Sequence, residues 1–289
     1  MVFLVYDWAV QRRQWMIIRA ARKTQAIVSS LFPKNVQDRI MKDVDEEVNR
    51  EANGPLITRG NRTKDQLQNF LKGKEATTDG VEGEGAKRSK PIADLFPEAT
   101  IIFADIVGFT AWSSTREPSQ VFQLLETIYH VFDEIANRRR VFKVETVGDC
   151  YVAVAGLPEP RKDHAIVMAR FARDCLMQFT STVKAMVVEL GPDTEELGVR
   201  IGLHSGPVTA GVLRGERARF QLFGDTVNTT ARMESTGIPN KIHVSQETAD
   251  LLAAAGKSQW LRTRKEKVVA KGKGELQTYW LYFTGENGT

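Results

Sequence analysis

The stretch VFKVETVGDCYVAVA, residues 141–155, determines how this chain folds. Its apolar and β-branched residues favour extended strands, and Gly148-Asp149 in its middle favours a chain reversal. The stretch is therefore predicted to be a β-hairpin. The neighbouring elements follow from the same patterns: a strand at Thr100–Ala104, an amphipathic helix at Pro118–Arg138 and a long helix from Asp163 to about Leu190.

The rest of the pattern continues this alternation of strands and helices. Strands are predicted at Val199–His204 and Val208–Val212, a helix at Asp225–Ser235, and further strands near Trp260, Val268 and Trp280. Strand, helix, hairpin, helix, strand is the ferredoxin-like order. The predicted fold class is therefore α+β, a ferredoxin-like α/β sandwich.

Two aspartates carry the first chemical signal. Asp105 follows the predicted strand Thr100–Ala104, Asp149 lies at the hairpin reversal, and both are close to a glycine. An Asp beside a Gly after a strand is also a common turn residue. Two carboxylates on neighbouring strands can instead hold two divalent cations against a triphosphate, because Mg²⁺ takes one or two carboxylates plus substrate phosphates. The pair therefore predicts polyphosphate chemistry.

Composition predicts one globular domain with an appendage. The chain has 289 residues, 42% hydrophobic and 26% charged, which suits a single domain at residues 91–285. Residues 46–90 are rich in glycine and mixed charge and are predicted to be a flexible linker. Cys150 and Cys175 are too few for a disulfide framework, and the four histidines lack zinc spacing. A reducing, cytosolic compartment follows.

Residues 1–45 have a different character and are predicted to form an N-terminal helical segment next to a membrane. Residues 11–42 hold eight Lys or Arg and one Asp, as on a solvated helix face or beside anionic lipid. Met1–Trp8 resembles the end of a membrane-spanning helix, although no stretch reaches the 18 or so apolar residues needed to span. We expect the cytosolic part of a longer integral membrane receptor. One apolar stripe could pair in a dimer: Ile17, Ala20, Thr24, Ile27 and Leu31.

Four motifs occur in series over about 170 residues: FADIVGFT (103–110), KVETVGD (143–149), FGDTVNTTARMES (223–235) and KGKG (271–274). Together they resemble the catalytic domain of a class III nucleotidyl cyclase, the family of the adenylyl and guanylyl cyclases. The resemblance runs from about Pro91 to Phe283. It implies the family's α+β fold and formation of a 3′,5′-cyclic nucleotide with release of pyrophosphate.

The resemblance also assigns metal and phosphate ligands. Asp105, Asp149 and the main-chain carbonyl of Ile106 match the residues that hold two divalent ions, Mg²⁺ or Mn²⁺, in the family. Backbone amides of the glycine-containing loop can approach phosphate oxygens closely. This loop contains Gly108, Phe109 and Thr110.

Further matches concern the transition state and the terminal phosphates. Asn228 and Arg232 lie one helical turn apart and match the residues that orient the ribose and contact the α-phosphate. Lys271 matches the lysine that binds the terminal phosphates, and Lys273 is the second candidate. The family's usual basic position near residue 216 is a glutamate here. Its role falls to one of Arg214, Arg217 and Arg219, and the sequence does not say which.

Two positions bear on the choice of base. Glu145 matches a glutamate that accepts hydrogen bonds from guanine in guanylyl cyclases, whereas adenylyl cyclases usually carry lysine there. A carboxylate accepts only, and adenine N1 is also an acceptor, so Glu145 favours GTP over ATP. Gln221 fits neither usual pattern, because its amide can donate to guanine O6 or accept from the adenine amino group.

In the family the metal aspartates come from one subunit and the base, ribose and phosphate residues from its partner. This chain carries both sets, so the resemblance implies a homodimer. A catalytically silent nucleotide-binding module stays open as an alternative. A polymerase or diguanylate cyclase is disfavoured because no Gly-Gly-Asp-Glu-Phe motif is present, and a net charge of +4 is too small to suggest nucleic acid.

Overall fold

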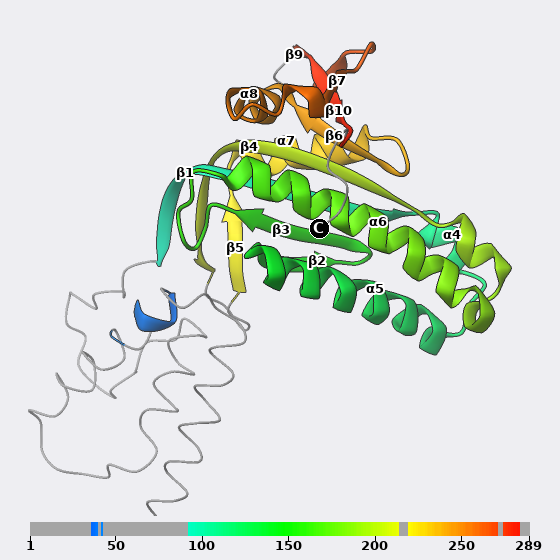
Figure 1. Ribbon diagram of the computed structural model, residues 1–289. Helices are drawn as coiled ribbons and strands as arrows, with labels where there is room; N and C mark the ends of the chain where they lie inside the picture. Colours follow the sequence, from blue (N-terminus) through cyan, green and yellow to red (C-terminus); the bar gives the residue numbers. More distant parts are fainter. Residues whose placement is uncertain (1–35, 40–41, 43–91, 214–218, 271–273, 284–289) are drawn as a thin grey trace, which may run out of the picture. The chain divides into compact units, whose positions relative to one another are not determined.

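The computed structural model describes residues 36–39, 42, 92–213, 219–270 and 274–283 (Figure 1). The described residues divide between two compact units, one drawn from residues 1–94 and 210–221, the other from residues 95–209 and 222–289. The predicted N-terminal segment and linker lie almost wholly outside the described residues. Residues 36–39 are helical, and no helix within the described part of the chain is long and apolar enough to cross a membrane.

The larger elements follow the predicted alternation. The first half of the domain contains β1 (Ala93–Val107), α4 (Phe109–Ser113), α5 (Pro118–Arg139), β2 (Phe142–Val147), β3 (Cys150–Ala155), α6 (His164–Leu190) and a 3₁₀ turn, η1 (Pro192–Glu196). The second half contains β4 (Gly198–Leu213), β5 (Arg219–Phe223), α7 (Asp225–Ser235), β6 (Lys241–Ser245), α8 (Gln246–Ala254), η2 (Ser258–Trp260), β7 (Leu261–Thr263), β8 (Val268–Ala270), β9 (Gly274–Leu276) and β10 (Thr278–Leu281).

The main sheet mixes parallel and antiparallel pairs, which confirms the α+β class. Its strand order is β2-β3-β1-β4-β6-β10-β7, with β5 paired to β4. The hairpin strands β2 and β3 are antiparallel, as are β1 and β3, whereas β4 and β6 are parallel. The predicted hairpin at residues 141–155 is confirmed.

One strand prediction was wrong. The strands predicted at Val199–His204 and Val208–Val212 are a single strand, β4. Gly206-Pro207 favours a break, but the parallel pairing of β4 with β6 ends at Leu203. Proline has no backbone N–H to donate, and beyond Leu203 no β6 partner is present to require one, so the strand continues through it.

Helices α5 and α6 pack against each other and against the hairpin (Figure 1). Helix α5 begins with a capping box at Glu117 and with Pro118 in its first turn, and it ends at Arg140 in a left-handed conformation. The apolar residues along one side of α5 and those of α6 are buried in the same hydrophobic core. The core residues from these two helices include Leu124, Ile128, Phe132, Met168, Phe171 and Phe179.

His243 in β6 makes stability depend on pH. Its ring is fully buried, Nδ1 donates to the Met233 carbonyl (2.7 Å) and Nε2 lies 2.8 Å from the Thr278 hydroxyl. Burial lowers the pKa of His243 to about 4. Between pH 6.5 and 4, the histidine is protonated in the unfolded chain but stays neutral in the folded chain. The free energy of unfolding therefore decreases as pH falls from about 6.5 toward 4.

We expect the free energy of unfolding to fall by about 2 kcal/mol between pH 8 and pH 5 through this group. Urea titrations of the wild-type chain and of His243→Gln at both pH values check the prediction. The variant is expected to be less stable at pH 8 but to lose less on acidification. An equal loss in both proteins would show that other groups cause the acid sensitivity.

Candidate active site

Asp105 and Asp149 are brought together by strand pairing. Asp105 in β1 lies directly opposite Cys150 in β3, and Asp149 is the residue before Cys150 in the β2–β3 turn. Burial raises the pKa of both carboxyls, and the charge of Asp105 further raises the pKa of Asp149. Two partly buried carboxylates that repel each other form a site where a cation is favourable. Asp105 lies within β1, two residues before its end, and not just past a strand as predicted.

A glycine and a tyrosine shape the turn that carries Asp149. Gly148 has a φ of +63° and a Cβ there would meet nothing within 4 Å, so the turn requires glycine for its backbone conformation and not for space. The Tyr129 hydroxyl donates to the Gly148 carbonyl (2.8 Å), and the Tyr129 ring packs against Tyr151. The turn is therefore tied to α5.

Sequence reasoning missed Arg200 and Glu234. The Arg200 guanidinium in β4 donates to Asp105 Oδ2 (2.9 Å) and, through Nε, to Glu234 Oε1 (2.7 Å) of α7. It counteracts the effect of burial on the pKa of both carboxyls. An isolated arginine in an apolar strand gives no signal in the sequence, because its partners lie 95 residues before it and 34 residues after it.

The residues present fit a magnesium-type site. Within the described residues no group of three or more His, Cys, Asp or Glu side chains could hold a metal ion. Mg²⁺ does not need such a group, since one or two carboxylates with substrate phosphates suffice. Asp105 and Asp149 supply the two carboxylates, and Ile106, the next residue of β1, has a buried side chain.

The chain turns sharply after β1 and enters a short helix. Gly108 has a φ of +87° and its carbonyl accepts from the Trp112 amide (2.9 Å), which begins the short helix α4. Thr110 is exposed, whereas Phe109 packs against the core. The Trp112 indole donates to Thr194 (3.2 Å), which ties α4 to η1.

The candidate base-selecting residues belong to different compact units. Glu145 is half-buried in β2, next to a register shift, and it makes no side-chain hydrogen bond or ion pair within the described part of the chain. Gln221 is half-buried in β5 and belongs to the other compact unit. Arg219, at the start of β5, is exposed. The remaining phosphate candidates lie outside the described residues: Arg214, Arg217, Lys271 and Lys273.

Helix α7 has a buried face and an exposed face. Asn228 and Arg232 lie one turn apart on the helix, as predicted, and both are exposed. The buried residues of the helix are Thr226, Thr229, Thr230, Met233 and Glu234. The helix therefore presents Asn228 and Arg232 away from the sheet.

A mixed α+β sheet with two adjoining carboxylates, and a helix that presents an amide and a guanidinium, defines a domain suited to metal-dependent nucleotide chemistry. Residues 93–282 match the family model of the adenylate and guanylate cyclase catalytic domain. The chain belongs to this family, which confirms the class indicated by the four motifs.

The chain is also similar to curated proteins named as a receptor-type guanylate cyclase and a natriuretic peptide receptor. The chain is 41% identical over 256 residues to the receptor-type guanylate cyclase gcy-28 of Caenorhabditis elegans, covering 78% of this chain and 19% of that protein. It is 45% identical over 200 residues to atrial natriuretic peptide receptor 2 of Homo sapiens, covering 68% and 18%. The chain thus spans about a fifth of the length of these curated relatives.

Among solved structures, the guanylate cyclase domain of RhGC from Catenaria anguillulae, in complex with GTP, superposes with a TM-score of 0.57 at 36% identity. The match covers 65% of this chain and 97% of the other.

Proposed function

We propose that this domain is a guanylate cyclase that converts GTP to 3′,5′-cyclic GMP and pyrophosphate. The observation that carries the choice of GTP is Glu145, a half-buried carboxylate without a partner in the described residues, in the hairpin that also holds Asp149. Guanine offers N–H donors at N1 and its 2-amino group, which a carboxylate can accept. The guanylate cyclase relatives and the RhGC complex with GTP support this choice.

Asp105 and Asp149, with the main-chain carbonyl of Ile106, would hold two Mg²⁺ or Mn²⁺ ions. Bound there, such ions would supply activation of the ribose 3′-hydroxyl and neutralisation of the departing pyrophosphate. Arg200 pairs with Asp105 in the structure and keeps one of the two negative charges balanced. The loop amides of residues 108–110 would cradle the phosphates.

The exposed side chains of α7 would act on the reacting centre. Asn228 would orient the ribose, and Arg232 would stabilise the charge that builds on the α-phosphate, a contribution that grows in the transition state. Lys271 would bind the terminal phosphates, with Lys273 as second candidate. Cyclisation joins two groups of one substrate, so these residues contribute mainly by orientation and charge.

A complete site is proposed to form between two copies of the chain. One copy would supply Asp105 and Asp149, and the other would supply Glu145, Gln221, Asn228 and Arg232. Each chain holds both sets, so a head-to-tail homodimer would contain two equivalent sites. A monomer would be inactive.

The domain is proposed to be the cytosolic part of an integral membrane receptor. The support is the receptor-type character of the relatives, and the fact that the chain spans only about a fifth of them. Residues 1–45 would then link an upstream sensor to the catalytic domain.

The proposal is tested by incubating purified protein with GTP and, separately, ATP, each with Mg²⁺ or Mn²⁺, and resolving the products chromatographically. Cyclic GMP in excess is expected. Cyclic AMP in excess would mean that Gln221 and the shape of the pocket override Glu145. No product from either nucleotide would support a catalytically silent nucleotide-binding domain.

A further inference from the structure

One face of β4 carries the helix that presents Asn228 and Arg232. Residues two apart on a strand share a face, so Gly202, His204 and Gly206 lie in one row. A Cβ added at Gly202 would lie 2.1 Å from the Glu234 amide nitrogen, and one added at Gly206 would lie 2.8 Å from Thr226 Oγ1. Both ends of helix α7 therefore pack against glycine residues of β4, where no side chain separates helix and strand.

The spacing of these contacts shows how the helix lies. Four residues of strand, from Gly202 to Gly206, span about 13 Å. Eight residues of helix, from Thr226 to Glu234, span about 12 Å. The two lengths match, so α7 lies lengthwise on this row, with its first turn at Gly206 and its last at Gly202.

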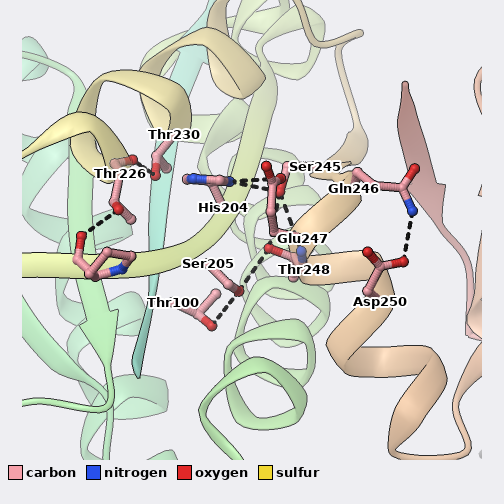
Figure 2. A network of polar contacts seen from close by, with 11 residues as sticks. Thr100, His204, Ser205, Thr226, Thr230, Ser245, Gln246, Glu247, Thr248 and Asp250 are labelled. Carbon is pink, nitrogen blue, oxygen red and sulfur yellow. Dashed lines mark hydrogen bonds and ion pairs between the residues drawn. The ribbon is translucent and has the colours of Figure 1, made fainter. Parts of the chain in front are cut away.

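Polar contacts hold both ends of the helix on the strand. The Thr226 hydroxyl donates to the Pro207 carbonyl (2.5 Å), and Arg200 holds Glu234 at the other end (2.7 Å). Between them lies His204, whose Nδ1 is 2.8 Å from the Ser245 hydroxyl and 3.4 Å from Glu247 (Figure 2). A Cβ at Gly206 would also approach His204 Nε2 to 3.7 Å.

Buried hydrogen bonds on the other face of β4 hold the strand in place. Ser205, on the other face of β4, is hydrogen-bonded to Thr100 of β1 and to Thr248 of α8, each at 2.8 Å (Figure 2). All three side chains are buried. A group added at Gly206 must therefore turn the Thr226 hydroxyl away from the Pro207 carbonyl or displace the first turn of α7.

We propose that Gly206 is a positioning residue for catalysis, because its lack of a side chain sets how closely the first turn of α7 lies on β4 and thus where Asn228 and Arg232 stand. This inference rests on the proposed function. A methyl group at residue 206 needs at least about 0.6 Å more room to reach an ordinary contact distance from Thr226 Oγ1, which lies 2.8 Å away. A misplacement of about 1 Å can lower a rate about 100-fold.

The test uses a double-mutant cycle with a matched control. Gly206→Ala is expected to lower kcat for cyclic GMP formation about 10- to 100-fold, with KM for GTP changed less than about 3-fold. Thr226→Ala removes the obstructing hydroxyl, so the double variant is expected to recover most of the lost kcat. Gly198→Ala is the control: it adds the same methyl to β4, but that methyl meets Asn240 at 3.3 Å, outside α7.

Melting temperature is measured for every variant, so that kcat is compared per folded protein. The inference is overturned if Gly206→Ala keeps its kcat, if Gly198→Ala loses as much, or if Thr226→Ala brings no recovery. Failure of the proposed function looks different, because the wild-type protein would then form no cyclic GMP.

Discussion

Replacing Asp149 by Asn is expected to lower cyclic GMP formation at least about 100-fold while leaving the metal-free protein as stable as the wild type, or more stable. The loss follows because an amide cannot provide the charge that a divalent ion needs, and such ions contribute several kcal/mol of charge stabilisation. The stability follows because burial and, after it, the charge of Asp105 raise the pKa of Asp149, so the fold disfavours the ionised form of this carboxyl. Activity assays and metal-free thermal melts, both near pH 7.5, check the two halves of the prediction.

Asp163→Asn is the matched control. Asp163 is ion-paired with Arg161, and this pairing lowers the pKa of its carboxyl, the opposite direction from Asp149. The control is expected to lose stability slightly and to keep its activity. An Asp149→Asn protein that keeps full activity would contradict a metal role for this carboxylate. One that unfolds at clearly lower temperature without metal would contradict the claim that the fold disfavours its charge.

Replacing Glu145 by Gln is expected to lower kcat/KM for GTP about 100-fold or more and to leave kcat/KM for ATP unchanged or higher. Glutamine has nearly the same shape, but it offers one acceptor and one donor where guanine presents two donors. A site that pairs with substrate N–H groups strongly disfavours a mismatch, because buried polar groups are left unpaired. Initial rates over a range of GTP and ATP concentrations give both constants.

The exposed Glu159, in the loop after β3, provides the same substitution away from the site. Glu159→Gln is expected to behave as the wild type. If Glu145→Gln also discriminates GTP from ATP as the wild type does, base selection lies elsewhere, and Gln221 becomes the leading candidate.

Long elements with strong periodicity were predictable from the sequence. Helices α5 and α6 and the hairpin β2–β3 were found because many residues repeat the same pattern. Short elements such as β6 and α8 were missed, since five to nine residues give too few repeats. The break predicted in β4 failed because Gly206 and Pro207 were interpreted locally, whereas strand pairing and the packing of α7 decide the outcome there.

The candidate site was predictable where chemistry is local and not where it depends on pairing. Asp105, Asp149, Asn228 and Arg232 stand in motifs that can be read along the chain. Arg200 cannot, because its role comes from two carboxylates on other elements. The roles of all these residues stay predictions, and Lys271 and most of the N-terminal segment also lie outside the described residues.

The most direct test of a cyclic GMP-forming site shared by two chains is complementation. Asp149→Asn and Arg232→Ala proteins, each expected to be inactive alone, are mixed, allowed to exchange subunits and assayed with GTP. Half of randomly mixed dimers would be heterodimers with one intact site, so about a quarter of wild-type cyclic GMP formation is expected. A mixture as inactive as its components, although exchange is demonstrated, would contradict the shared site.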